Sequence, residues 1–370
     1  MELINSTRLV AGFTLGLEPS GRESLIVVVK GTFGFPAAGE PVRLAEEQAP
    51  LVMADVFTGE PGFSAPLYEV DFALRKRRCD VLLNGSAYAP GGRPAARVDV
   101  GLRVNGMSKS FVVMGDRVWQ AGASGIGAST PIPFTVQPFC YDRAFGGVDN
   151  RDPNPSNHAA FMPNPAGRGF HKHLRADWVD GTPMPNTEEA RRSVSMPNDT
   201  KVRPMAFGPI GRGWDPRAQL AGTYDDEWLK EHFPFLPPDF DEGYYQAAPP
   251  DQQIPHPQGG EEIVLANLTP EGRASLTLPT FDAPIHFFPK SGNREDGKLL
   301  LDTIVIEPDL QRFQLTWRAT RPLKKNLYEI AQILVGRKPG AWWVEREKVE
   351  FPILLRPVRV KPADGEEEEA

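Results

Sequence analysis

Cysteine is scarce in this chain, and so are the long apolar runs that mark membrane segments. Only two cysteines, Cys79 and Cys140, occur in 370 residues. A secreted protein of this length usually carries more cysteines in disulfides, so we expect two free thiols in a reducing cytoplasm. Apolar runs such as residues 25–29 are far too short to cross a bilayer, and the N-terminus shows no basic segment followed by an apolar stretch. We therefore expect a cytoplasmic protein without a signal peptide or a membrane span.

The chain also lacks an excess of positive charge. It has 41 Lys and Arg against 48 Asp and Glu, a formal net charge of −7. Nucleic-acid binding needs a basic surface field, so we expect no nucleic-acid partner. The one basic cluster, Arg75 to Arg78, is typical of a solvated strand or turn. Residues 362–370 are acidic and carry no large apolar side chain, and we expect a disordered tail there.

The motifs of common enzyme chemistry are missing as well. The sequence has no Gly-x-Ser-x-Gly nucleophile elbow, no phosphate-binding Gly-Lys-Ser/Thr loop and no dinucleotide-binding fingerprint. His171 and His173 stand two residues apart without a clear third metal ligand, and the two cysteines do not form a metal-binding pair. We therefore expect a non-enzymatic protein with no catalytic residue, no metal and no cofactor.

Four acidic residues keep an alternative function open. Asp225, Asp226, Asp239 and Asp241 could supply the paired acid and base of a glycosidase. Helix capping and Asx turns explain the same residues without catalysis. The alternative hypothesis is therefore a carbohydrate-binding or carbohydrate-processing β protein, in which aromatic rings stack on sugars.

Proline and glycine, in contrast, are abundant, with 38 and 35 residues. Both interrupt helices, so the composition favours short strands and many turns. Apolar and polar residues alternate along residues 96–104 and 313–320, which is typical of strands with one buried face. We predict an all-β fold, an antiparallel β-sandwich or barrel-like structure, with a long irregular Pro/Gly-rich insertion and a few short peripheral helices.

The pattern divides the chain into four regions. Residues 1–120 read as a β-meander, in which strands 96–104, 107–114 and 117–120 pair in order through turns at Asn105-Gly106 and Gly115-Asp116. Residues 121–260 form the aromatic, Pro/Gly-rich loop region, with one short helix at 226–233. Residues 261–361 form a C-terminal β region that packs with the N-terminal region and contains an amphipathic helix at 325–335. The acidic tail, 362–370, follows.

Aromatic residues are dense in the loop region, from about residue 133 to residue 253. Each large ring buries roughly 150–250 Å², so such a segment is ordered rather than disordered. Rigid aromatic loops on a β scaffold suit the recognition of another macromolecule, although core packing explains some of these rings equally well. The candidate partner-binding residues are Trp, Tyr and Arg side chains of this region: Tyr141, Arg143, Trp214, Arg217, Tyr224 and Trp228.

A series of motifs in the same order along most of the chain resembles a family associated with bacterial type VI secretion, catalogued as domain of unknown function 2169. The motifs are Ala54 to Gly62, Tyr68 to Ala73, Asp80 to Pro90, Gly115 to Trp119, Tyr141 to Gly147, Asn164 to Phe170, Phe207 to Arg217, Ala221 to Trp228, Leu236 to Asp241, Leu301-Asp302 and Trp317-Arg318.

The resemblance implies a cytoplasmic adaptor or chaperone for a secreted effector. Such an adaptor would hold the effector's PAAR-like tip region and help to load it onto the spike, so the effector is the expected partner and the spike protein a second one. The family has no established catalytic or binding residues, and none is transferred to this chain.

Overall fold

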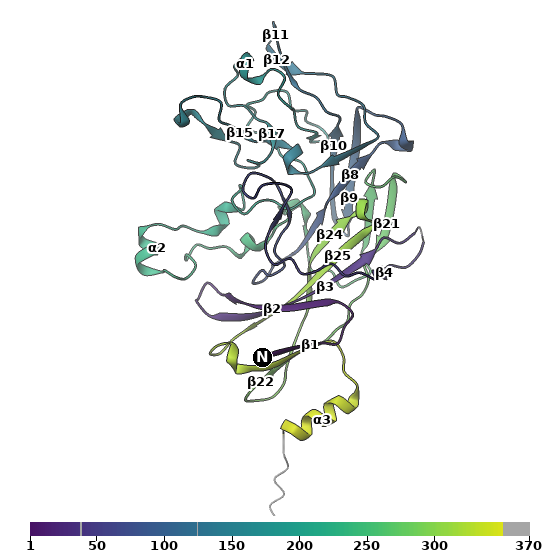
Figure 1. Cartoon of the computed structure of the whole chain (residues 1–370), viewed down its shortest axis with the longest axis vertical. Helices are drawn as coiled ribbons and strands as arrows, with labels where there is room; N and C mark the ends of the chain where they lie inside the picture. The colour runs from purple at the N-terminus through teal and green to yellow at the C-terminus, as the bar shows by residue number, and fades with distance from the viewer. Residues whose placement is uncertain (38, 124, 351–370) are drawn as a thin grey trace, which may run out of the picture.

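The computed structural model describes residues 1–37, 39–123 and 125–350 (Figure 1). Strands dominate these residues, and helices are few and short. The all-β prediction is confirmed. The predicted acidic tail at 362–370 and the end of the predicted C-terminal region lie outside the described residues.

A seven-stranded sheet forms the centre of the molecule, in the order β19-β7-β24-β25-β3-β2 with β4 on β3. Its strands are β2 (Val10–Leu17), β3 (Glu23–Gly34), β4 (Arg43–Leu44), β7 (Cys79–Leu83), β19 (Gln253–Ile254), β24 (Leu300–Glu307) and β25 (Arg312–Pro322). The long strand β3 pairs with β25 along its whole length, so segments from opposite ends of the chain form the middle of the sheet. Most pairings are antiparallel, and β24 with β7 is parallel.

Two further sheets complete the scaffold. One has the order β18-β10-β9-β20-β21 and consists of β18 (Thr187–Glu188), β10 (Met107–Met114), β9 (Arg97–Val104), β20 (Glu262–Ala266) and β21 (Arg273–Thr277). The other has the order β1-β26-β22-β23 and consists of β1 (Glu2–Asn5), β26 (Ile330–Val335), β22 (Ile285–Pro289) and β23 (Glu295–Gly297).

One apolar core joins these sheets into a sandwich. Val27 of β3 and Val100 of β9 belong to the same cluster of buried side chains, to which β7, β10, β20, β24 and β25 also contribute. Near its centre the ring of Phe111 lies 4.6 Å from that of Phe207, centroid to centroid. The alternation that predicted these strands is therefore the alternation between this core and the outer faces of the two sheets.

The remaining elements are short and lie mostly in the loop region, of which β11, β12, β15, β17 and α1 form the upper part of Figure 1. They are β5 (Val56–Phe57), β6 (Pro66–Tyr68), β8 (Gly85–Tyr88), β11 (Trp119–Gly122), β12 (Gly125–Ala128), β13 (Val136–Phe139), β14 (Phe145–Gly146), β15 (Val148–Asp149), β16 (Ala159–Ala160), β17 (Arg168–Gly169), α1 (Ala176–Val179) and α2 (Asp226–Glu231). A separate cluster around Trp119 and Phe145 gives this region a core of its own. Helix α3 (Gly340–Glu350) follows the third sheet.

The predicted hairpin of residues 96–104 and 107–114 is confirmed as β9 and β10. Met107 pairs with Val104, so Asn105 and Gly106 form a two-residue loop. Asn105 has a φ of 51°, the left-handed conformation that such a turn requires.

The third strand of that meander was predicted wrongly. Residues 119–122 pair with β12 instead of β10, and β18 takes the place beside β10. Gly115 lies so close to Ile132 that a Cβ at Gly115 would collide with its backbone oxygen. The chain therefore leaves the sheet at this point, and Trp119 is buried in the upper cluster, where its indole N–H donates to the carbonyl of Gly169 over 2.9 Å.

The helix predicted at 325–335 is also wrong. A single 3-10 turn, Leu327–Glu329, leads directly into strand β26. β26 lies between β1 and β22, and Ile333, Leu334 and Val335 are all fully buried. A strand covered on both faces needs no polar alternation, so its apolar spacing also fits a helix. The helix predicted at 226–233 is confirmed as α2.

Candidate functional site

Two of the predicted contact residues, Tyr141 and Trp214, are part of an internal cluster. Both are buried, and their rings pack edge to face with centroids 5.6 Å apart. Ala206 and Ile210 close the same cluster. In this position the two rings support the surface above them and are not open to a partner.

Arg217 is buried as well, in an ion network beneath the loop region. Its guanidinium bonds to the carboxylate of Glu69 and donates to the carbonyl of Ile210 over 2.9 Å. Arg212 lies beside it and pairs with Asp55 at 2.8 Å and with Glu69 at 2.8 Å. Burial lowers the pKa of Arg212, but its hydrogen bond to Asp55 and the charge of Glu69 outweigh that cost and raise the pKa overall.

The predicted basic cluster, Arg75 to Arg78, also contains a buried and ion-paired side chain. Lys76 is buried, and its ammonium group lies 2.6 Å from the carboxylate of Asp80, whereas Arg75 and Arg77 are exposed. The solvated-turn prediction is therefore wrong for Lys76. The cause is the outer face of the central sheet, where Asp80 and Thr303 offer acceptors to the ammonium group.

Arg143 occupies an intermediate position. It is half-buried, and Nη1 lies 3.4 Å from the side-chain oxygen of Asn186. The histidines of the loop region make local contacts: His171 Nε2 lies 3.0 Å from the hydroxyl of Thr182, and His173 Nε2 lies 3.2 Å from the carbonyl of Asn157. Both cysteines are free, as predicted.

Tyr224 and Trp228 lie on a projection that we call the aromatic arm, residues 223–240. In Figure 1 the arm, which carries α2, extends to the left of the body. Asp225 begins the helix by accepting the N–H of Trp228 over 2.9 Å. Trp228 is half-buried within the arm: its ring packs edge to face on Tyr224 at 4.8 Å, and on Phe233 at 5.7 Å.

The two ends of the arm are joined at its base. The N–H of Asp241 donates to the carbonyl of Leu220 over 3.0 Å. The carboxylate of Asp239 accepts the backbone N–H and the hydroxyl of Thr223, over 2.9 and 2.7 Å. The arm is thus a closed loop packed by its own side chains, which is the organisation of an Ω-loop.

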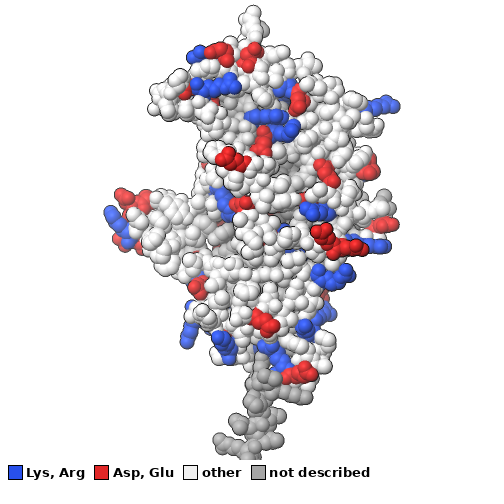
Figure 2. Space-filling view, viewed as in Figure 1, with Lys and Arg blue, Asp and Glu red and all other residues white. Residues whose placement is uncertain are grey.

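The arm presents an unusual amount of apolar surface. Its exposed large side chains are Tyr224 (53%), Leu229 (58%), Phe233 (62%) and Phe235 (45%). The arm also contains five acidic residues and one lysine, a net charge of −4. Figure 2 shows acidic side chains, next to a basic one, at the tip of the projection. The surface is therefore apolar with an acidic rim.

Three of the four acidic residues of the glycosidase alternative have structural contacts here, and the fourth, Asp226, lies in the first turn of α2. Asp225 and Asp239 bind backbone groups of the arm, as described above. Asp241 accepts the N–H of Gly243 over 2.6 Å and pairs with Arg77 at 2.9 Å. Hydrogen bonds from the backbone lower the pKa of Asp239 and of Asp241. Lowered pKa values suit capping and do not suit a general acid.

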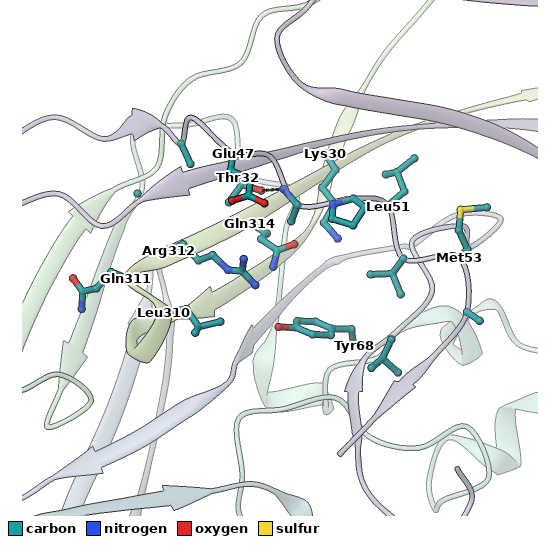
Figure 3. Close-up of a pocket in the computed structure, with 17 residues that line it drawn as sticks. Lys30, Thr32, Glu47, Leu51, Met53, Tyr68, Leu310, Gln311, Arg312 and Gln314 are labelled. Atoms are coloured by element: carbon teal, nitrogen blue, oxygen red, sulfur yellow. Dashed lines mark hydrogen bonds between the residues drawn. The ribbon is translucent and has the colours of Figure 1, made fainter. Parts of the chain in front are cut away.

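A second candidate site is a cavity of about 750 Å³ on the outer face of the central sheet. Strands β3 and β25 form its floor, and residues 45–56 form one wall. Figure 3 shows that the side chains of Lys30, Tyr68, Arg312 and Gln314 converge, with Leu310 on one side of them and Leu51 and Met53 on the other. The cavity therefore has an apolar lining and one cluster of polar side chains, which we call its polar end.

Glu307 forms hydrogen bonds with three of the side chains at the polar end. Its carboxylate is buried and accepts the hydroxyl of Tyr68, Nε of Arg312 at 2.7 Å and Nε2 of Gln314 at 2.7 Å. Burial, then the hydrogen bond to Glu307 and the charge of that group, raises the pKa of Tyr68 to about 12. The phenol therefore stays protonated and donates to Glu307 at physiological pH.

Sequence reasoning missed this cavity. Tyr68 stands within a motif, but Arg312 and Gln314 belong to the polar half of an alternating strand, which predicts a solvated face. The face is instead covered by residues 45–56 and by Tyr68. A signal was present: Glu307, Arg312 and Gln314 place three hydrogen-bonding side chains around one turn.

Fold and sites together define a class of protein, a β-sandwich with an aromatic arm and an amphipathic cavity. The chain belongs to the family described as "Uncharacterized protein conserved in bacteria (DUF2169)", whose model matches residues 20–318. The arm and the polar end of the cavity fall within the matched range. No curated protein and no solved structure matches the chain. Within the part of the chain that is described, no helix has both the length and the apolar character to span a membrane.

Proposed function

We propose that this protein is an adaptor that binds a polypeptide client through the aromatic arm. One observation carries the proposal: four large apolar side chains are exposed together on a loop that is closed and packed by its own residues. Exposed apolar patches with a polar rim mark interaction sites, and aromatic residues supply much of the binding energy in such sites. A loop that is already ordered loses little conformational entropy when it binds.

The charge of the arm indicates which kind of client it would bind. A net charge of −4 around the apolar side chains favours a partner whose apolar segment is flanked by basic residues. Such a segment would aggregate if it were left exposed, and covering it is what a chaperone does. The proposed activity therefore depends on a surface of suitable shape and charge and involves no chemical reaction.

The resemblance described above suggests which client this is. A cytoplasmic adaptor of type VI secretion would hold the PAAR-like region of an effector and help to load it onto the spike. We propose the effector encoded beside this protein as the client and the spike protein as a further partner. The support is the motif series on which the resemblance rests, together with the exposed apolar surface of the arm.

The test is co-expression with that effector and pull-down. Because Leu220 and Asp241 are hydrogen-bonded at the base of the arm, residues 224–238 can be replaced by a short glycine linker without separating the rest of the chain. The variant should keep the melting temperature of the parent protein and lose the effector. Capture of the effector at the parental level by the folded variant would contradict the proposal.

A further inference from the structure

The acceptors at the polar end of the cavity are already occupied. Glu307 receives three donors, as described above. Asp71, behind Lys30, accepts Nζ of Lys30 over 2.9 Å and the N–H of Val52 over 2.7 Å. A carboxylate whose lone pairs already accept hydrogen bonds from the protein has little capacity to accept hydrogen bonds from a ligand in the cavity.

Unused donors remain in front of these acids. Lys30 is almost fully buried, yet among the described residues Asp71 is the one hydrogen-bond partner of its Nζ, which has three N–H groups. Arg312 bonds to Glu307 through Nε and also interacts with the hydroxyl of Tyr68, but within the described residues no carboxylate or carbonyl oxygen accepts from its Nη groups. Both side chains point into the cavity in Figure 3. A ligand at this end must therefore supply acceptors.

The rest of the cavity selects an apolar body. Leu51, Val52, Met53 and Val56 form one wall and Leu310 lies across from them. The volume of about 750 Å³ lies within the range of small-molecule sites. Gly34 lines the same space, and a Cβ built on it meets no atom within 4 Å, so this part of the floor is open.

We propose that this cavity binds a carboxylate attached to an apolar body, with the carboxylate held by Lys30 and the Nη groups of Arg312. Arginine binds carboxylates with paired, charge-assisted hydrogen bonds, which are stronger than neutral ones. Glu47 lies at the exposed rim and bears a charge of the same sign as the ligand. Its charge slightly weakens the binding of the carboxylate.

Two sources share this chemistry: a free carboxylic acid with an alkyl chain, and the C-terminus of a peptide that ends in apolar residues. Isothermal titration calorimetry separates them with four probes. Octanoate is compared with octanamide, and the peptide acetyl-Ala-Ala-Val-Leu is compared as its free acid and as its amide. At least one acid should bind about tenfold more tightly than its amide, because the amide lacks the charge that Lys30 and Arg312 bind.

Variants of residues that line the cavity test whether the ligand binds there. Gly34→Leu should fill the open floor and abolish binding of the acid, whereas Gly127→Leu, at another open glycine in β12, should not change it. Arg312→Gln should weaken the acid about tenfold, and Glu47→Gln should tighten it roughly twofold by removing a like charge. Melting temperatures confirm that each variant is folded.

The outcomes divide cleanly. Selective binding of octanoate identifies a small-molecule acid, and selective binding of the free peptide acid identifies a C-terminus; either supports the proposed chemistry. Equal affinity for acid and amide, no binding by either acid, or unchanged binding by folded Gly34→Leu would each overturn it.

Discussion

Trp228 donates its indole N–H to the carbonyl of Phe235 over 2.9 Å and so ties helix α2 to the returning segment of the aromatic arm. The ring of Phe235 in turn lies against Gly21, at the turn between β2 and β3, where a Cβ would come within 2.6 Å of it. The arm is therefore held both by itself and by the edge of the central sheet, and it presents a fixed surface.

Loss of the Trp228 ring should loosen the arm without unfolding the sandwich. Trp228→Ala removes the indole hydrogen bond and the edge-to-face contacts with Tyr224 and Phe233. Amide exchange, followed by mass spectrometry, should accelerate within residues 221–240 and stay unchanged in β3 and β25. Unchanged exchange in the arm, or a general increase, would show that the arm is not a separate packing unit.

Two tyrosines that look alike in the sequence should behave differently. Tyr141 is buried against Trp214, so Tyr141→Ala should lower the free energy of unfolding by roughly 3–5 kcal/mol. Tyr224 is exposed on the arm, so Tyr224→Ala should lower it by less than about 1 kcal/mol. Urea denaturation measures both values, and similar values for the two variants would be inconsistent with the structure.

The buried ion pairs of the central sheet should be sensitive to the loss of one partner. Nε of Arg318 lies 2.6 Å from the carboxylate of Asp302, and both side chains are buried. Asp302→Ala leaves a buried charge without its partner and should cost about 3–5 kcal/mol. The matched control is Asp282→Ala, which breaks an exposed pair of the same length with Arg337 and should change the melting temperature little. Equal effects would contradict the buried network.

Lys109 should make stability rise at alkaline pH. Burial, only partly offset by the charge of Asp251, lowers the pKa of Lys109 to about 8, from its ordinary value of 10.5. The unfolded chain therefore binds more protons than the folded chain between these values, and unfolding becomes less favourable as the pH rises from about 8 to 10.5.

The measurement is the difference in melting temperature between the parent protein and Lys109→Met across this pH range. The melting temperature of the parent should increase relative to that of the variant as the pH rises. Lys298→Met, which removes an exposed charge, is the control and should give a constant difference. If the melting temperature of the parent falls relative to that of Lys109→Met as the pH rises, the pKa of Lys109 is not lowered in the folded state.

Local features of the sequence predicted the local features of the fold. The alternation in β9 and β10 and the Asn105-Gly106 turn specify a hairpin without reference to the rest of the chain. The cap at Asp225 likewise marks the start of α2. β26 was predicted wrongly because Ile333, Leu334 and Val335 are buried in succession, on both faces of the strand, and a short apolar run then has no distinctive period.

The sites could be predicted only in part for the same reason. The composition of the loop region indicated an aromatic surface, but which rings face outward depends on contacts between distant residues, such as Tyr141 with Trp214. The cavity needs Tyr68, from the separate β5–β6 pair, to meet Arg312 at Glu307 of the central sheet. Tyr68 is 239 residues away from Glu307 in the sequence, and no local pattern predicts that contact.

The most direct measurement of the account is the affinity of the effector for a double variant of the arm. Leu229→Ala with Phe233→Ala truncates two exposed side chains that make no part of the sandwich core, and Tyr328→Ala, at an exposed tyrosine near the third sheet, is the control. The double variant should keep its melting temperature and lose at least about 2 kcal/mol of binding free energy, roughly a thirtyfold loss of affinity, while the control should bind as the parent does. Parental affinity in the folded double variant would contradict the claim that the aromatic arm binds the client.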